Sequence, residues 1–264
     1  MGRTRGRHRG RLALATLVVA AAVVVYVKLG PPSDSTCSFG SGGSYSLAAQ
    51  QVDEASIIAA VAERLGLPDH AVTVALATAL QETKLRNLPY GDEDSVGLFQ
   101  QRPSEGWGTR AEILNPIYAA TAFYQRLVQV PDWQTLPVTD AAQMVQHSAD
   151  PLAYAQWATE ARTLAVALTG EVPAGLSCSV HSYRGAPTSA AVGAREQAEL
   201  GVPGFGVPVG TTRGWQLAMW AVAHAYDDHL RAVSFDERTW TSGVGWHRAP
   251  SATPDEVTVQ TAGP

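Results

Sequence analysis

An uninterrupted apolar run at residues 12–27 constrains what the rest of the chain can become. Five arginines precede this run of 16 apolar or small residues, and Lys28 follows it. A helix of that length spans about 24 Å, and Leu29 with a snorkelling lysine extends it toward the roughly 30 Å hydrocarbon core. We therefore expect residues 12–29 to cross the membrane as a signal anchor. Residues 1–11 then form a basic cytoplasmic tail, and everything after the anchor is exported.

The residues after the apolar run bear on whether the anchor is cut. No A-x-A-like cleavage site follows the run, which favours an uncleaved anchor, with secretion after cleavage as the alternative. We expect a single-pass protein of the cell membrane whose C-terminal domains are extracellular.

The charge of the exported part excludes one class of partner. The net charge is −5, but six of the 19 basic residues lie within the first 28, leaving 13 against 24 acidic residues, or −11. A surface this acidic repels phosphate backbones, so we expect no nucleic-acid partner.

Two cysteines, Cys37 and Cys178, both lie on the exported side of the predicted anchor. An oxidising compartment favours a disulfide between them, which would enclose residues 38–177; two unpaired buried thiols are the alternative.

Hydrophobic periodicity divides the exported part. Helical spacing runs through residues 57–65, 70–86, 115–128, 140–145 and 151–168, and punctuating glycine or proline residues separate several of these segments. The final segment has one helical face from Trp215 to Tyr226, followed by alternating apolar residues typical of strands. The predicted organisation is a tether at 30–50, a first domain at 51–170, a linker containing Cys178 at 171–212, and a small α/β module at 213–264.

Glu82 lies near the end of the apolar helix predicted at residues 70–86. The negative end of the helix dipole and the apolar neighbours both disfavour an ionised carboxylate, so the pKa of Glu82 is expected to rise. A carboxyl group that is partly protonated near neutral pH can act as a general acid. The alternative is an ordinary solvated glutamate at a helix end.

The motifs around Glu82 resemble the lysozyme-like superfamily of soluble lytic transglycosylases and goose-type lysozymes. Glu82-Thr83 matches the catalytic glutamate and the small hydroxyl residue after it, and Gly97-Leu98-Phe99-Gln100 matches the motif that lines the cleft. The block 88–108 is similar to a group of membrane-anchored or secreted actinobacterial cell-wall hydrolase-like proteins. The resemblance covers about residues 50–170 and implies a mainly α (α+β lysozyme-like) domain after the transmembrane helix, followed by the small α/β module.

This resemblance implies cleavage of the β-1,4 bond between N-acetylmuramic acid and N-acetylglucosamine in peptidoglycan, without a cofactor. Glu82 is the implied general acid/base. The implied substrate-binding residues are Thr83, Phe99, Gln100, Trp107 and Tyr118. The family's later Ala-Tyr-Asn-Ala-Gly motif, whose tyrosine lies near the catalytic glutamate, is missing, and Tyr154 or Gln146 is the candidate substitute.

A second carboxylate decides the type of product. Asp94 is the best candidate in the acidic turn 92–94, either to stabilise positive charge on the sugar or to orient a water. A solvated turn, or a carboxylate that caps its own backbone, is the alternative. Lytic transglycosylases use no second carboxylate, because by resemblance the muramic 6-hydroxyl attacks and leaves a 1,6-anhydro end. The sequence leaves hydrolysis and transglycosylation open.

Neither candidate metal site has the spacing of a known motif. The acidic turn lacks the calcium-loop pattern, and His224, Asp228 and His229 lack an H-E-x-x-H pattern and do not share one helix face. We expect no metal, and we interpret these histidines as satisfied surface residues.

Two other functions stay open alongside peptidoglycan cleavage. A catalytically weak or inactive descendant would bind cell-wall glycan strands as a scaffold protein through the same cleft. The module at 213–264 resembles a C-terminal module of other exported actinobacterial proteins, and it is a candidate binding surface for an envelope protein. Its tryptophans favour core packing over ligand binding.

Overall fold

The computed structural model describes residues 35–40, 43–148, 150, 152–183, 189–201 and 203–262. The predicted membrane span at 12–29 lies outside these ranges. Within them, no helix is both long and apolar enough to cross a membrane.

The described chain has 45% helix and 17% strand, so its fold class is mixed α/β. The prediction of a mainly α fold is therefore wrong for the chain as a whole, because short strands from distant segments pair into two sheets. The helices are α2 (Ala49–Arg64), α3 (Asp69–Thr83), α4 (Arg110–Ile113), α5 (Pro116–Leu127), α6 (Val138–Gln146), α7 (Ala158–Leu168), α8 (Ser189–Leu200) and α9 (Thr211–Ala223), with 3-10 turns η1 (Pro103–Glu105) and η2 (Ala155–Trp157).

The first sheet joins the beginning of the described chain to its middle. It has the order β2-β1-β3, with β1 (Thr36–Phe39) antiparallel to both β2 (Tyr45–Ala48) and β3 (Leu176–Ser179). Cys37 lies directly opposite Cys178 in this register, and a disulfide joins them as predicted. Strands β1 and β2 thus lie within residues 30–50, which were expected to be a tether, and β1 is held by its pairing with β3.

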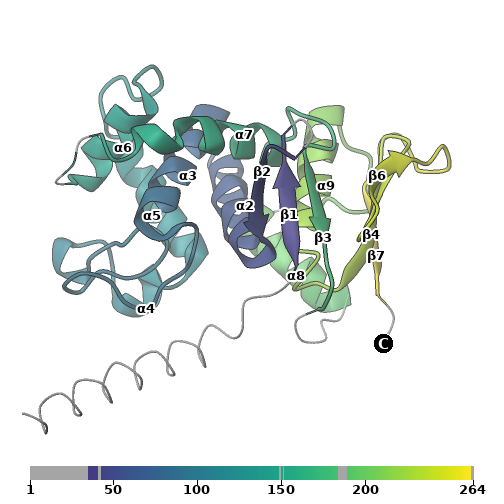
Figure 1. Cartoon of the computed structure of the whole chain (residues 1–264), viewed down its shortest axis with the longest axis horizontal. Helices are drawn as coiled ribbons and strands as arrows, with labels where there is room; N and C mark the ends of the chain where they lie inside the picture. The colour runs from purple at the N-terminus through teal and green to yellow at the C-terminus, as the bar shows by residue number, and fades with distance from the viewer. Residues whose placement is uncertain are drawn as a thin grey trace, which may run out of the picture. The chain divides into compact units, whose positions relative to one another are not determined.

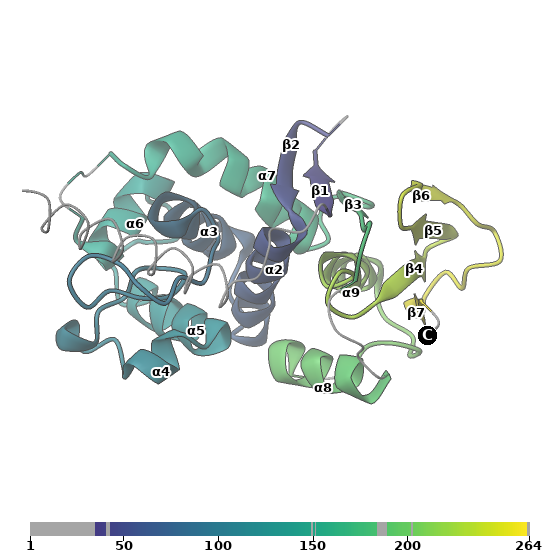
Figure 2. The same cartoon turned by 60° about the horizontal axis from the view of Figure 1, so that its bottom comes forward.

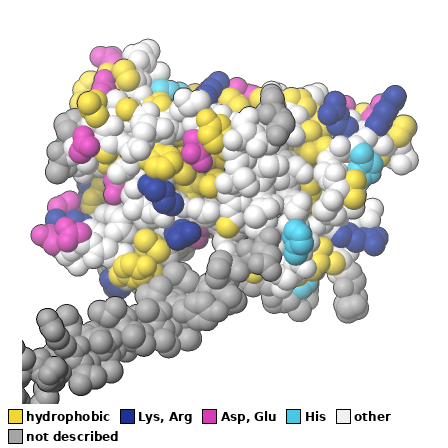
Figure 3. All heavy atoms as spheres, viewed as in Figure 1, with side chains coloured by type: hydrophobic (Ala, Val, Ile, Leu, Met, Phe, Trp, Pro, Cys, Tyr) yellow, Lys and Arg dark blue, Asp and Glu magenta, His cyan; other side chains and the backbone are white. Residues whose placement is uncertain are grey.

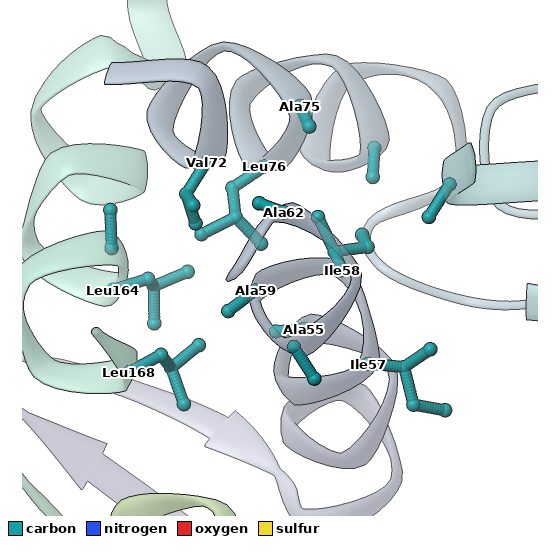
Figure 4. Close-up of a cluster of buried hydrophobic side chains, with 14 of the residues drawn as sticks. Ala55, Ile57, Ile58, Ala59, Ala62, Val72, Ala75, Leu76, Leu164 and Leu168 are labelled. Carbon is teal, nitrogen blue, oxygen red and sulfur yellow. The ribbon is translucent and has the colours of Figure 1, made fainter. Parts of the chain in front are cut away.

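Helices α2, α3 and α7 form the core of the helical part (Figure 4). Val72 and Leu76 of α3 point toward small residues of α2 and toward Leu164 and Leu168 of α7, and all of these side chains are buried. Each buried aliphatic side chain of this size contributes about 1.5–3 kcal/mol to folding. Alanines on the facing surface of α2 let the helices approach closely, because they add little bulk between the axes.

Helix α9 lies between α2 and the second sheet (Figures 1 and 2). This sheet has the order β6-β5-β4-β7, with β4 (Leu230–Phe235), β5 (Arg238–Thr241), β6 (Gly245–Arg248) and β7 (Thr258–Thr261), all antiparallel. Three tryptophans of this part are at most 2% exposed and fill its core, namely Trp215, Trp220 and Trp240. Core packing is thus the role of most of the tryptophans considered for ligand binding.

The described residues, all of which lie after residue 34, belong to one compact unit. The expected linker at 171–212 contains β3 and α8, and α8 packs against α2. The lysozyme-like domain at residues 51–170 stays a prediction.

A buried ionic cluster joins α2, α8 and the end of α9. We define it as Asp53, Glu54, Arg195, Glu199, His224 and Asp228. His224 Nε2 lies 3.0 Å from Glu199 Oε2 and 3.5 Å from Asp53 Oδ1, while Arg195 Nε lies 3.2 Å from Asp228 Oδ1. His224 is 0% exposed, so its interpretation as a surface residue is wrong, and Asp228 is 1% exposed. The packing of α8 over the end of α9 buries them, and sequence periodicity within α9 does not reveal that neighbour.

Candidate functional site

Glu82 occupies the last turn of α3, and the residues after it stop the helix. Lys84 and Leu85 both adopt left-handed backbone conformations, with φ values of 55° and 56°. The Leu85 backbone N–H donates to the Ala79 carbonyl at 3.1 Å, which closes the helix end. The helix therefore ends shortly before the residue predicted, and Glu82 projects from its C-terminal turn.

Two side chains distant in sequence donate hydrogen bonds to the same oxygen of Glu82. The Tyr154 hydroxyl donates to Glu82 Oε1 at 2.9 Å, and the Gln146 amide donates to it at 3.4 Å. Gln146 also donates to the Phe99 carbonyl at 2.8 Å, which fixes the amide between the two. Both candidates for the missing family tyrosine thus lie at Glu82, and Tyr154 makes the shorter bond.

The environment of Glu82 favours a proton on its carboxyl group. Burial raises the pKa of Glu82, while the hydrogen bonds from Tyr154 and Gln146 and the Lys84 charge oppose the rise. Burial and the Glu82 charge also raise the pKa of Tyr154, so the phenol keeps its proton and stays a donor. A raised pKa lets the carboxyl group keep its proton to higher pH, which suits a general acid.

Thr83 ties the helix end to the Gly97–Gln100 segment. Its hydroxyl donates to the Leu98 carbonyl at 2.8 Å, and the side chain is 5% exposed. Gly97 has a φ of +81°, and a Cβ atom there would lie 2.8 Å from the Ile113 carbonyl oxygen. Thr83 is therefore a brace between two segments of the site, and glycine is required at 97.

Phe99 and Gln100 are neighbours with different environments. Phe99 is fully buried and stacks on Phe123 with ring centroids 4.8 Å apart, so its side chain supports the site from the core. The half-buried Gln100 amide donates to the Tyr90 carbonyl at 3.3 Å and the Gly97 carbonyl at 3.2 Å. Gln100 is thus the more accessible of the two residues for a ligand.

Asp94 is tied into its own loop. One oxygen accepts from Arg102 Nε and from the Ser104 hydroxyl, each at 3.0 Å, and the other accepts from the Ser104 backbone N–H at 2.8 Å. Arg102 also pairs with Glu93 and Glu105. Among the described residues these contacts bind Asp94 to its loop and do not join it to Glu82.

Trp107 and Tyr118 lie on either side of Gly108, and the hydrogen bonds to Glu82 come from other residues, Tyr154 and Gln146. Trp107 is 6% exposed, and the Arg126 guanidinium carbon lies 3.4 Å from the centre of its ring. The half-buried Tyr118 crowds the residue after Trp107, because a Cβ atom on Gly108 would lie 2.5 Å from the Tyr118 hydroxyl oxygen. The structure therefore places these two predicted substrate contacts in the packing between the loop and α5.

Sequence reasoning missed a second set of contacts at the end of α3. Trp157 Nε1 donates to Gln81 Oε1 at 2.7 Å, and the Lys84 ammonium lies 4.1 Å from the centre of the Trp157 ring. The sequence did indicate that Gln81 and Lys84 lie near the site, because they flank the Glu82-Thr83 pair. Nothing in the local sequence identifies Trp157 as their partner. Figure 3 shows hydrophobic side chains next to basic and acidic ones over the helical side of the molecule.

Two further features bear on ligands. No group of three or more His, Cys, Asp and Glu side chains is arranged to hold a metal ion in the part of the chain that the structure describes. A polar pocket of about 400 Å³ lies on the four-stranded sheet; its lining includes Arg231, Ser234, Thr239 and Gln260 and none of the Glu82 contacts.

Comparison with models of known protein families and with curated proteins found no match to this chain.

Proposed function

We propose that this protein is a peptidoglycan-cleaving enzyme with Glu82 as its general acid/base. The observation that carries the proposal is the 2.9 Å hydrogen bond from the Tyr154 hydroxyl to Glu82 Oε1. The resemblance of the Glu82-Thr83 and Gly97–Gln100 motifs to lytic transglycosylases and goose-type lysozymes calls for a tyrosine at the catalytic glutamate. The motif that usually supplies it is missing, and the hydrogen bond from Tyr154 to Glu82 supports Tyr154 as its substitute.

In the proposed mechanism, protonated Glu82 donates to the glycosidic oxygen between N-acetylmuramic acid and N-acetylglucosamine as that bond breaks. Tyr154 and Gln146 both donate hydrogen bonds to Oε1. We therefore assign the transferred proton to Oε2. The same donors stabilise the carboxylate that remains, which then takes a proton from the attacking hydroxyl group.

The attacking group is proposed to be the muramic 6-hydroxyl, which makes the protein a lytic transglycosylase. Hydrolysis with two carboxylates requires a partner about 5–9.5 Å from the acid. Both carboxylate oxygens of Asp94, the candidate partner, already accept hydrogen bonds from Arg102 or Ser104. This favours chemistry through Glu82 alone and a 1,6-anhydro product over a reducing end.

The proposed location follows from the sequence. Residues 12–29 anchor the chain in the cell membrane and the remainder acts outside it on glycan strands of the wall. The four-stranded sheet and its polar pocket are the surface proposed for an envelope protein partner.

The test is mass spectrometry of purified peptidoglycan incubated with the full chain in detergent. Wild type is expected to release 1,6-anhydromuropeptides, and Glu82→Gln is expected to release none while keeping its fold. Glu160→Gln is the matched control. Burial also raises the pKa of the Glu160 carboxyl group, but the hydrogen bonds from Tyr154 and Gln146 go to Glu82.

Each other outcome has a distinct meaning. Reducing-end products would establish a lysozyme-type hydrolase and overturn the proposed attack by the 6-hydroxyl. Equal activity in Glu82→Gln would remove the proposed role of Glu82. A folded wild type that retains glycan strands without releasing products would identify a wall-binding scaffold protein instead.

A further inference from the structure

The 3-10 turn η2 holds helix α3 through two side chains. Tyr154 precedes the turn and Trp157 ends it, and the Trp157 backbone N–H donates to the Tyr154 carbonyl at 3.0 Å. From this turn Tyr154 reaches Glu82, and Trp157 reaches Gln81, the residue before it. Gln81 and Glu82, which are adjacent in α3, are therefore hydrogen-bonded by Trp157 at the end of η2 and by Tyr154 just before it.

The contacts of Gln81 are as specific as those of Glu82. Gln81 Oε1 accepts from Trp157 Nε1 at 2.7 Å and from Gln156 Nε2 at 3.1 Å, so one oxygen takes donors from two consecutive residues of η2. On the other side of the indole, the Lys84 ammonium lies 4.1 Å from the ring centre. The indole is thus held at its edge by Gln81 and covered by Lys84.

The segment that carries Tyr154 leads from α6 to α7, and the Tyr154 side chain is itself buried in the core. It follows the end of α6, where His147 adopts a left-handed conformation, and Leu152 is 70% exposed. The Tyr154 hydroxyl makes its bond to Glu82 at 2.9 Å, and a displacement of about 1 Å would break a bond of that length. What fixes the turn on α3 therefore also fixes that hydrogen bond.

We infer that Gln81 and Trp157 are positioning residues, whose hydrogen bond holds the Tyr154 hydroxyl on Glu82. The catalytic meaning of this pair rests on the proposed function, whereas its effect on Glu82 does not. In the enzyme, loss of the pair lowers kcat about tenfold, the size of one hydrogen bond, and leaves KM near its wild-type value. Neither residue needs to touch the substrate.

The test measures the pKa of Glu82 directly, by carbon-13 NMR titration of the full chain labelled at glutamate side chains. The variants are Gln81→Met and Trp157→Phe, alone, together and each combined with Tyr154→Phe. Met keeps the length of the side chain without the accepting oxygen, and Phe keeps a ring under Lys84 without the indole N–H. The Lys84 charge, which opposes the rise in the Glu82 pKa, therefore keeps its place in both variants.

Each single variant is expected to raise the pKa of Glu82, because a displaced Tyr154 no longer stabilises the carboxylate. The double variant should raise it no more than the larger single one, and neither change should add to Tyr154→Phe. Trp133→Phe is the control, because that buried indole stacks near His70 and not on α3's final turn; it should leave the Glu82 pKa unchanged.

Two results would overturn the inference. An unchanged Glu82 pKa in variants with reduced stability would make the pair purely structural, and shifts that simply add would show that Gln81 and Trp157 act independently. Failure of the proposed function is distinguishable, since a wild type without products can still show the expected shifts. A cleaving wild type whose single variants keep the Glu82 pKa would retain the function and exclude the positioning role.

Discussion

His224 Nε2 lies 3.0 Å from Glu199 Oε2, with the imidazole fully buried. The imidazole stacks on Trp220 at 4.3 Å between ring centroids, and Trp220 Nε1 donates to the same Glu199 oxygen at 2.8 Å. Glu199 and Asp53 raise the pKa of His224 to about 10 although burial opposes this. The cation is therefore part of the native core and joins α2, α8 and α9.

Removing that cation should destabilise the fold. In His224→Gln the carboxylates of Glu199 and Asp53 lose a buried positive charge, which costs about 3–5 kcal/mol. Urea denaturation followed by circular dichroism measures the change. His247→Gln, at an exposed histidine of β6, is the control and should stay within about 0.5 kcal/mol of wild type. Equal stability of the two variants would show that the cluster does not stabilise the fold.

Stability should fall as the pH rises from 7 to 10. The His224 pKa is raised from 6.5 to about 10, so its stabilising contribution is complete below pH 6.5 and is lost as the pH rises through 10. The Asp53 pKa, raised to about 6 chiefly by burial, gives a loss of the same sign that is complete above pH 6. Urea midpoints between pH 7 and 10 test this, and the alkaline slope should be smaller in His224→Gln. A wild-type midpoint that does not move would contradict the assigned charge.

Tyr154→Phe should raise the pKa of Glu82 and lower the rate of the proposed peptidoglycan cleavage about tenfold. The alkaline limb of the pH–rate profile, where Glu82 loses the proton that it must donate, should move to higher pH, because the carboxylate loses its shorter hydrogen bond. Tyr124→Phe removes another buried hydroxyl, which donates to the Ile58 carbonyl at 3.1 Å, and should lower stability without moving the profile. Identical pH–rate profiles for the two variants would show that Tyr154 does not act on Glu82 during the reaction.

Reduction of the Cys37–Cys178 disulfide should lower stability by roughly 5 kcal/mol on the chain-entropy model, since the bond closes a loop across a sequence separation of 141. Urea denaturation with and without a reductant measures the loss, and a thiol assay should find free thiols only after reduction. The variant with both cysteines changed to serine should not respond to the reductant. Free thiols in the protein before reduction would contradict the bond.

Gly97→Ala should destabilise the chain more than Gly66→Ala. Both glycines have positive φ, at +81° and +68°, but a Cβ atom on Gly97 would meet the Ile113 carbonyl oxygen at 2.8 Å, whereas nothing lies within 4 Å at Gly66. The backbone conformation alone costs about 1–2 kcal/mol at either position. The excess at Gly97, measured by urea denaturation, reports the close approach between its loop and α4. Equal losses would mean that Ile113 gives way.

The amino-acid sequence by itself determined most of the helices and the disulfide. Apolar spacing from Ile57 to Leu65 and the following Gly66 predicted α2, and helical spacing over residues 115–128 predicted α5. These features are local, because a helix is specified by residues three and four apart and ends at residues with special backbone conformations. The oxidising side of the predicted anchor indicated the cysteine pair.

Only the tertiary structure decided which side chains meet. Tyr154 lies 72 residues from Glu82, and within its own segment it could not be distinguished from Gln146 as the partner. The pairing of β1 with β3 depends on strands of four residues, too short to carry a periodicity of their own. His224 and Asp94 also depend on neighbours from other elements. Packing of α8 buries His224, which was expected at the surface, and Arg102 holds Asp94, the candidate second carboxylate, in its own loop. Burial and charge pairing are properties of neighbours in space, and those neighbours come from distant parts of the chain.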